Sequence, residues 1–197
     1  MSAQFLRSAA AAATVAMLAA PAVAHADEVR LGFGRSGHDL VIEDEFGKEQ
    51  GLSVTGEYLF DSPSILRYVG SPRPYVGAMV SLDGYTNFLS AGLNWRASYK
   101  RVYMDVGGGA GIHDGNITLP QPEVGLSAEE NERRRQLNRE FVEFGRRVLF
   151  NATLTAGYRV TDHWAVEIGA QHWSNGNVHS AHNDGSDILH LRTAYRF

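Results

Sequence analysis

The chain has 197 residues, enough for one domain, and its lack of cysteine excludes both a disulfide framework and a lipid-modified N-terminal cysteine. Its 18 Lys and Arg residues against 22 Asp and Glu residues give a net charge of −4, which argues against a nucleic-acid-binding protein. The mean hydropathy of −0.24 is slightly polar. It does not exclude a membrane β-barrel, because barrel strands place apolar residues at every second position.

Residues 1–26 have the pattern of a secretory signal peptide. Arg7 precedes a run of small apolar residues, and cleavage sites follow after Ala24 and Ala26. We favour cleavage after Ala26, which leaves residues 27–197 as the mature chain. The removed segment contains one basic and no acidic residue, so 17 basic and 22 acidic residues remain, a net charge of −5. No later segment reaches the ~18 consecutive apolar residues of a membrane helix.

Apolar and polar residues alternate in eight segments of the mature chain, as is typical of strands whose two faces meet different environments. The segments are 29–33, 52–60, 76–82, 89–96, 102–112, 148–159, 164–174 and 187–197. Several run to about ten residues, the length that crosses a bilayer at a tilt of about 45°, whereas strands in soluble proteins have about 5–6 residues. The pattern predicts an all-β fold, an eight-stranded antiparallel transmembrane β-barrel in the outer membrane of a Gram-negative bacterium.

The connections fit this topology if both termini lie in the periplasm. Ser98–Lys100 and Val160–His163 are then short periplasmic turns. Residues 35–51, 114–147 and 177–186 are extracellular loops, and in the first of them His38–Glu45 could extend a strand. Aromatic residues of the apolar face gather at the periplasmic ends and predict an interfacial girdle: Phe60, Trp95, Tyr158, Trp164, Tyr195 and Phe197.

The long loop 114–147, the third on the outer side in an eight-stranded barrel, is predicted to contain a helix. Ser127-Ala128-Glu129-Glu130 is a capping-box pattern, and no Gly or Pro follows until Gly145. The helix carries four arginines among four glutamates, which favours a solvated helix stabilised by ion pairs. The alternative is that these arginines bind phosphates of lipopolysaccharide.

Polar residues interrupt the apolar face of the last two strands at one level. In segment 164–174 the even positions form an apolar face that ends in His172 and Ser174, and Asp187 lies near the same end of the next strand. Ten strand residues at a tilt near 40° rise about 25 Å, so this cluster reaches the outer interface, where polar side chains cost about 0–1 kcal/mol. A serine nucleophile needs a base within reach and a group that orients the base. The three residues predict a catalytic site, with ordinary interfacial residues capping two strands as the alternative.

A motif near the C-terminus resembles that of the lipid A 3-O-deacylase family (PagL-like). It reads His172-Trp173-Ser174-Asn175-Gly176, then Asn183-Asp184-Gly185-Ser186-Asp187, then Tyr195-Arg196-Phe197. The family pattern is H-x-S-N-[A/G] followed by N-x-G-x-E on an eight-stranded outer-membrane barrel. The similarity spans the mature chain in pattern and is specific over residues 157–197. It implies that His172 is the general base, that Ser174 is the nucleophile and that Asn175 lies near the oxyanion hole.

The chain departs from the family pattern at the third catalytic position. Asp187 stands where the family has Glu, and the loop before it is one residue longer, so Asp184 is the alternative third member. Because Asp is one methylene shorter, its use requires that Asp187 lie nearer His172 than a diagonal neighbour about 7–8 Å away. His179 and His182 with Asp184 could suggest a metal site, but loop spacing without a fourth ligand is a weak signal, and we expect no metal.

The sequence thus predicts an outer-membrane serine esterase that removes a 3-O-linked hydroxyacyl chain from lipid A of lipopolysaccharide. This chemistry requires no cofactor. The expected partners are lipid A and the membrane, with no nucleic acid, and a homodimer is left open. The alternative function is a non-enzymatic eight-stranded barrel that serves adhesion or membrane integrity. Reaction of Ser174 with a serine-directed phosphonate would separate the two.

Overall fold

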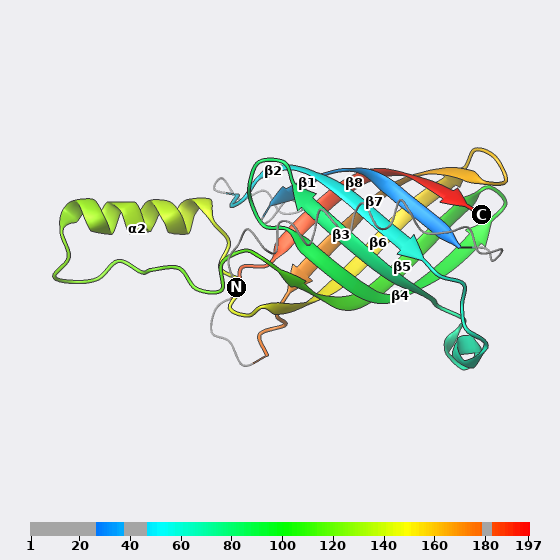
Figure 1. Ribbon diagram of the computed structural model, residues 1–197, viewed down its shortest axis with the longest axis horizontal. Coiled ribbons are helices and arrows are strands. Elements are labelled where there is room, and N and C mark those ends of the chain that lie inside the picture. Colours follow the sequence, from blue (N-terminus) through cyan, green and yellow to red (C-terminus); the bar gives the residue numbers. More distant parts are fainter. Residues whose placement is uncertain (1–26, 38–46, 179–182) are drawn as a thin grey trace.

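Eight antiparallel strands form a closed barrel in the computed structural model, which describes residues 27–37, 47–178 and 183–197 (Figure 1). Each strand pairs with its neighbour in sequence, and the barrel closes between the first and last strands. The strands are β1 Glu28–Gly37, β2 Gly51–Leu59, β3 Arg73–Ser81, β4 Phe88–Tyr99, β5 Val102–His113, β6 Val148–Arg159, β7 Trp164–Ser174 and β8 Ser186–Arg196. The predicted fold class is confirmed. The signal segment 1–26, the whole segment His38–Glu45 and both loop histidines, His179 and His182, lie outside the described residues.

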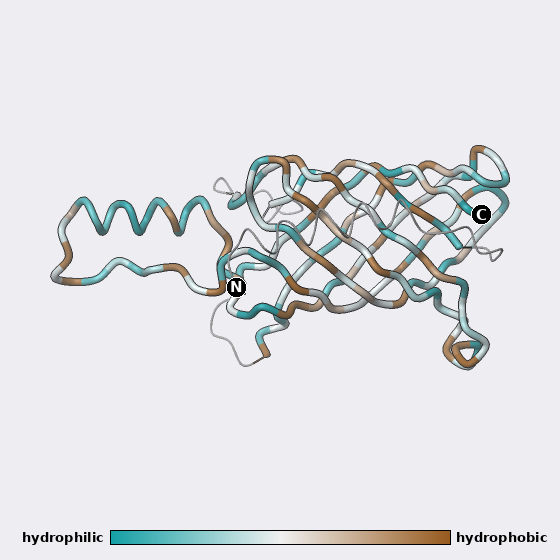
Figure 2. Tube along the Cα trace, in the orientation of Figure 1, coloured by the Kyte–Doolittle hydropathy of each residue, from teal (hydrophilic) through white to brown (hydrophobic). Residues whose placement is uncertain are grey.

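Side chains alternate between an apolar exterior and a mixed interior, and Figure 2 shows hydrophobic and hydrophilic residues alternating along the strands. On β7, Trp164 and Ile168 are 51% and 66% exposed, whereas Glu167 between them is 1% exposed. The predicted aromatic girdle lies near the end of the barrel that carries the short turns and the C-terminus, here called the turn end. Its rings touch one another: the centroids of Trp164 and Tyr195 are 4.8 Å apart, and those of Tyr195 and Phe197 are 5.2 Å apart.

The strand register fixes relative heights around the barrel wall. Cα partners followed from Trp164 on β7 through β8, β1 and the remaining strands return to β7 at Ser174, ten residues further on. A line of Cα partners therefore climbs ten residues over eight strand steps, or one and a quarter residues per step. This stagger is the shear that tilts the strands of a closed barrel.

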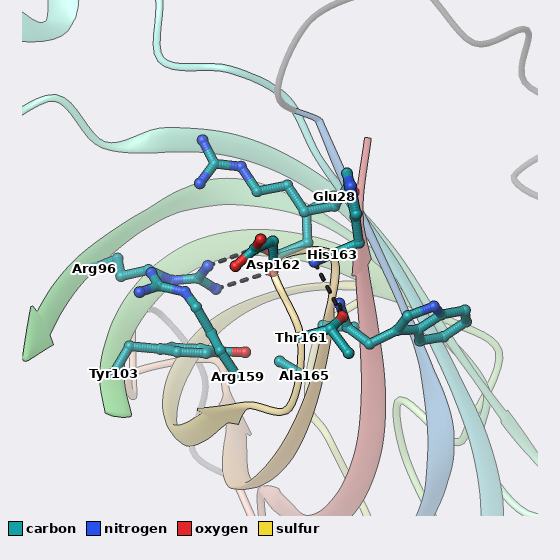
Figure 3. Close-up of a pocket in the computed structure, with 11 residues that line it drawn as sticks. Glu28, Arg96, Tyr103, Arg159, Thr161, Asp162, His163 and Ala165 are labelled. Carbon is teal, nitrogen blue, oxygen red and sulfur yellow. Dashed lines mark hydrogen bonds and ion pairs between the residues drawn. The ribbon is translucent and has the colours of Figure 1, made fainter. Parts of the chain in front are cut away.

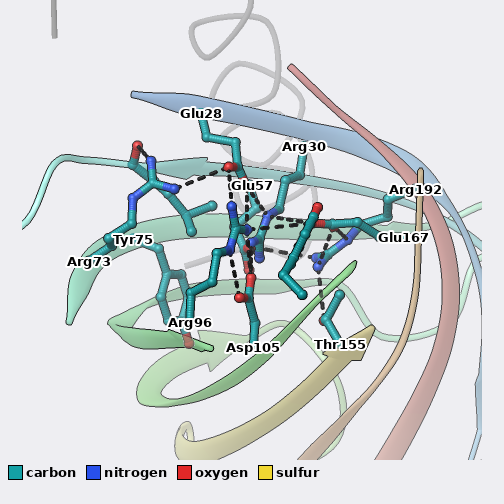
Figure 4. A network of polar contacts seen from close by, with 12 residues as sticks. Glu28, Arg30, Glu57, Arg73, Tyr75, Arg96, Asp105, Thr155, Glu167 and Arg192 are labelled. Carbon is teal, nitrogen blue, oxygen red and sulfur yellow. Dashed lines mark hydrogen bonds and ion pairs between the residues drawn. The ribbon is translucent and has the colours of Figure 1, made fainter. Parts of the chain in front are cut away.

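A charge network fills the interior near the turn end (Figure 4). It joins four arginines and four carboxylates: Arg30, Arg73, Arg96 and Arg192 with Glu28, Glu57, Asp105 and Glu167. Arg30 lies at its centre, 2.8 Å from both Glu28 and Glu57 and 3.2 Å from Glu167, and it also contacts Asp105. Equal numbers of opposite charges let the network remain buried inside the barrel.

An apolar cluster fills the interior at the opposite end, here called the loop end. Its members are Met79, Phe88, Val142, Phe144, Leu149, Trp173 and Ile188. Val142 and Phe144 are fully buried, although they belong to the third loop and not to a strand. The return segment of this loop, residues 141–145 (the loop plug), therefore completes the core beneath the site residues.

The predicted helix is present as α2, Ala128–Glu140, which projects beyond the loop end (Figure 1). Ser127 caps it by accepting a hydrogen bond from the Glu130 backbone N–H at 3.1 Å. All four arginines of the helix form ion pairs with carboxylates: Arg133, Arg134, Arg135 and Arg139. The favoured interpretation as a solvated, ion-paired helix agrees with these contacts.

The structure differs from the sequence-based prediction in several places. Ser98 and Tyr99 belong to β4, because the chain turns only at Lys100–Arg101, with Lys100 in the left-handed region (φ 52°). Residues 35–37 belong to β1 and not to the first loop, since their polar composition hid the continued alternation. A 3₁₀ helix, η1 (Ser64–Val69), was not predicted. Neither described helix is long and apolar enough to span a membrane.

Candidate active site

His172 and Asp187 face each other across β7 and β8 at the loop end. They are direct Cα partners, and His172 Nδ1 lies 2.7 Å from Asp187 Oδ1. Direct partners in an antiparallel pair are about 4.5–5.5 Å apart, closer than a diagonal neighbour, so the short Asp side chain spans the gap. Because Nδ1 donates its hydrogen to the carboxylate, Nε2 is left as the basic nitrogen of a neutral ring. The side chain of His172 is 57% exposed, and that of Asp187 is 16% exposed.

Ser174 lies two residues beyond His172 on the same outward face of β7. Its Oγ accepts a hydrogen bond from the Gly176 backbone N–H at 3.3 Å. Gly176 and Asn177 both have positive φ values, 65° and 56°, so the chain turns sharply after the strand. The turn brings the Gly176 backbone N–H close to the serine oxygen, an arrangement suited to stabilising negative charge beside a nucleophile.

Asn175 points inward and is 2% exposed. Its side-chain amide donates to the Phe144 carbonyl at 2.8 Å, and its backbone N–H donates to Asn183 Oδ1 at 2.9 Å. Its Oδ1 accepts from the Asn177 backbone N–H at 2.7 Å. These bonds attach the turn after Ser174 to the loop plug, so the oxyanion role of Asn175 stays a prediction.

Asp184 lies among different partners from those of Asp187. Its carboxylate is 2.6 Å from Lys48 Nζ and accepts from the Glu143 backbone N–H at 3.0 Å. Its own N–H donates to the Glu143 carbonyl at 3.2 Å. The structure therefore places Asp187, and not Asp184, against the imidazole, while Asp184 joins the β7–β8 connection to the first loop and the loop plug.

Trp173, between the two candidate catalytic residues, anchors them from inside the barrel. It is 1% exposed and stacks on Phe88, with ring centroids 4.6 Å apart. Gly111 leaves room for it, because a Cβ there would lie 2.9 Å from the indole ring. A slip of β7 by one residue would pull Trp173 out of the core, so its packing fixes which face carries His172 and Ser174.

A family comparison decides the classification. The model of the family described as lipid A 3-O-deacylase (PagL) matches residues 75–196, which is more than half of the chain and includes the whole site. This chain belongs to the lipid A 3-O-deacylase family. It is accordingly an outer-membrane hydrolase acting on ester bonds, which sets aside the non-enzymatic alternative. No curated protein matches the chain.

Solved structures share the barrel of this deacylase-family chain. The crystal structure of the outer-membrane enzyme PagL aligns with a TM-score of 0.58 at 14% identity, covering 86% of this chain and 99% of that chain. Neisserial surface protein A aligns with a TM-score of 0.52 at 12% identity, covering 87% and 97%. At these identities the likeness shows the fold alone.

The supports of the deacylase-family site were not found by sequence reasoning. Lys48, Glu143 and Phe144 hold the loop that follows Ser174, but they are far from it in sequence and follow no repeating pattern. The sequence signal available for the loop plug was the pair of apolar residues Val142 and Phe144 within a long polar loop. The predicted signal peptide and the homodimer stay predictions.

Other polar clusters of the chain lie away from the site. A small pocket at the turn end is lined by residues that include Arg96, Tyr103, Arg159 and His163 (Figure 3), and it opens at the opposite end of the barrel from Ser174. Within the described ranges, no group of three His, Cys, Asp or Glu residues could hold a metal ion.

Proposed function

We propose that the chain is a serine esterase that removes the 3-O-linked hydroxyacyl chain from lipid A. The observation that carries the proposal is the His172–Asp187 hydrogen bond on the membrane-facing wall, two residues before an outward serine. A base oriented by a carboxylate beside a serine is the arrangement used for acyl transfer. Its height near the loop end of the barrel suits an ester of a lipid in the outer leaflet.

The proposed reaction has two steps. Ser174 Oγ attacks the ester carbonyl carbon while His172 Nε2 takes the serine proton, and Asp187 stabilises the resulting imidazolium. The tetrahedral intermediate collapses when Nε2 gives this proton to the departing sugar oxygen at position 3, leaving an acyl-serine. Water then attacks the acyl-serine, with His172 again taking and returning the proton, and the hydroxy fatty acid is released.

The Gly176 N–H is the best-placed backbone donor for the oxyanion, because it already lies 3.3 Å from Ser174 Oγ. The Asn175 side chain and N–H are engaged with Phe144 and Asn183, so they hold the turn that presents the Gly176 donor. Removal of a single oxyanion donor typically lowers kcat about 10²–10³-fold, so the geometry of this turn matters to the rate.

The test uses single substitutions at the two central residues. Ser174→Ala and His172→Ala should each lower deacylation by several orders of magnitude, about 10⁴-fold or more, because each removes a member of the proton-transfer pair. Mass spectrometry of lipid A from cells that express each variant should show the loss of one hydroxyacyl chain with the unaltered protein only. Both variants should stay folded, since these side chains face outward. Deacylation by either folded variant would exclude the mechanism.

A further inference from the structure

The outward face of β1 carries a cation where its neighbours are apolar. Arg35 is exposed, and its Cα partners on the two adjacent strands are Leu52 on β2 and Leu189 on β8. Phe33, two residues closer to the turn end on the same face, is 67% exposed. A guanidinium costs only about 0–1 kcal/mol at the interface, and an anion within its reach there would bind it through charge-assisted hydrogen bonds.

Arg35 lacks a carboxylate partner among the described residues. Its Nη2 donates to Gln50 Oε1 at 2.9 Å, a neutral acceptor, and a guanidinium has five N–H donors in all. The arginines of α2, which were the sequence-based candidates for phosphate binding, are instead occupied by glutamates of the loop itself. Arg35 is therefore better suited to bind an external anion.

The register places Arg35 level with the candidate active site. The Cα partner of His172 is Asp187, and that of Asp187 on β1 is Gly37. Each step along this line of partners climbs one and a quarter residues toward the loop end, so Gly37, two steps away, lies two and a half residues nearer that end than His172. Arg35 is two residues below Gly37 and therefore lies half a residue nearer the loop end than His172. The lateral separation of two strands is roughly 10–12 Å, and a side chain as long as Arg covers part of it.

We propose that Arg35 binds a phosphate group of the lipid A headgroup while the ester lies at Ser174. This inference rests on the proposed function. The two glucosamines of the substrate carry phosphates, and a guanidinium matches a phosphate with two parallel hydrogen bonds. A headgroup lying across β7, β8 and β1 meets Ser174 and His172 at one side and Arg35 at the other, and its acyl chains descend over Leu189, Leu191 and Phe33. Arg35 is then a substrate-binding residue that sets the position of the sugar.

The test compares Arg35→Gln with the unaltered protein on lipid A, on lipid A lacking either or both phosphates, and on an uncharged p-nitrophenyl ester. For doubly phosphorylated lipid A, Arg35→Gln should raise KM about ten- to hundredfold, the range of a charge-assisted hydrogen bond. It should change neither KM for fully dephosphorylated lipid A nor hydrolysis of the uncharged ester. The two singly phosphorylated substrates identify which phosphate is bound. Arg35→Lys should restore part of the affinity.

Controls separate this inference from the proposed function. Arg133→Gln on α2 removes an exposed arginine that pairs with Glu130, and it should leave all substrates unaffected. Binding of the same lipids by detergent-solubilised Ser174→Ala protein, with and without Arg35→Gln, is measured by calorimetry and needs no turnover. If the unaltered protein cleaves lipid A and Arg35→Gln does so equally well, only the phosphate site fails. If no lipid A is cleaved, the proposed function fails, and the calorimetric binding measurement still decides whether Arg35 binds a phosphate. An equal rise in KM for phosphorylated and dephosphorylated lipid A would also overturn the phosphate-binding role of Arg35.

Discussion

At the residue scale, the candidate third catalytic position shows how a short carboxylate can reach the imidazole ring. Asp187 is the direct Cα partner of His172, so its carboxylate reaches Nδ1 at 2.7 Å without the extra methylene of Glu. Gly185 lies next to the ring, and its φ of 72° favours glycine; a Cβ there would lie 3.0 Å from the Trp173 carbonyl oxygen and in ordinary contact, 3.4 Å, with His172 Cε1. The connection between β7 and β8 leaves Asp187 in register with His172.

This geometry predicts different effects for the two candidate aspartates. Asp187→Asn should lower kcat by orders of magnitude, because the neutral amide cannot stabilise imidazolium, and Asp187→Glu should keep partial activity. Asp184→Asn should have a small effect on the rate, since Asp184 pairs with Lys48 in a partly buried contact and does not touch the imidazole. The measurement is the rate of hydroxy-fatty-acid release by purified protein in detergent.

A double substitution makes the comparison sharper. In the His172→Ala background, Asp187→Asn should cause no further loss, because residues that act as one unit have non-additive effects. If Asp184→Asn behaves in this way and Asp187→Asn does not, Asp184 is the third member.

The site could be predicted as far as strand periodicity reaches. Period-two alternation places His172, Ser174 and Asp187 on one face, and the family motif names the first two. The contact of Asn175 with Phe144 and that of Asp184 with Lys48 could not be predicted, because they depend on loop conformation across 31 and 136 residues of sequence. Arg35 was not a sequence-based candidate because residues 35–51 were assigned to the first loop and not to the strand.

At the element scale, three loops are tied together at the loop end by Glu49. Its carboxylate accepts hydrogen bonds from the backbone N–H groups of Val142 and Thr86 at 3.3 and 3.2 Å, and its own N–H donates to the Glu140 carbonyl at 2.9 Å. Burial raises the pKa of Glu49 above its usual value, and the nearby Asp114 carboxylate adds to the rise, although the accepted hydrogen bonds oppose it. The loops that contain Glu49, Thr86 and Val142 thus meet at one titratable group.

A pH dependence of loop-end stability follows from this raised pKa. The folded loops bind the Glu49 proton more tightly than the opened loops do, so the stabilising contribution is fully present below the ordinary pKa of 4.5 and is lost as pH rises through the folded value. Hydrogen exchange of the 141–145 amides, corrected for the intrinsic exchange rate, should slow as pH falls across this window. Glu49→Gln should remove the dependence, whereas Glu140→Gln, an exposed carboxyl on α2, should keep it. Protection of the 141–145 amides that does not change with pH in the unaltered protein would contradict the prediction.

At the scale of the whole molecule, the barrel interior has two halves with different physical roles. The apolar half lies beneath the candidate site and holds Trp173, which fixes the face that carries the catalytic residues. The charged half lies near the turn end, closed around Arg30. Alternation predicted that residues such as Glu167 and Arg192 point inward. It did not predict that Arg30 on β1 meets Asp105 on β5, because this pairing crosses the barrel between non-adjacent strands.

Removal of Arg30 should destabilise the barrel strongly without changing the chemistry. Arg30→Met leaves Glu28, Glu57, Asp105 and Glu167 with too few cations, and loss of one partner of a buried ion pair costs about 3–5 kcal/mol. The midpoint of urea unfolding, followed by the heat-modifiable shift of the folded band on gels, should fall sharply. Arg133→Met, an exposed control, should leave it unchanged.

The folded fraction of the Arg30→Met protein should keep normal kcat on an uncharged ester, because the charge network lies at the other end of the barrel from Ser174. Arg30→Lys should give an intermediate midpoint, since it keeps the charge but not the forked geometry that reaches several carboxylates, and it keeps the test open if the Met variant does not fold. An unchanged midpoint in both variants would show that the buried charges contribute no net stability. A loss of kcat in folded Arg30→Lys protein would show that the two halves of the interior are coupled.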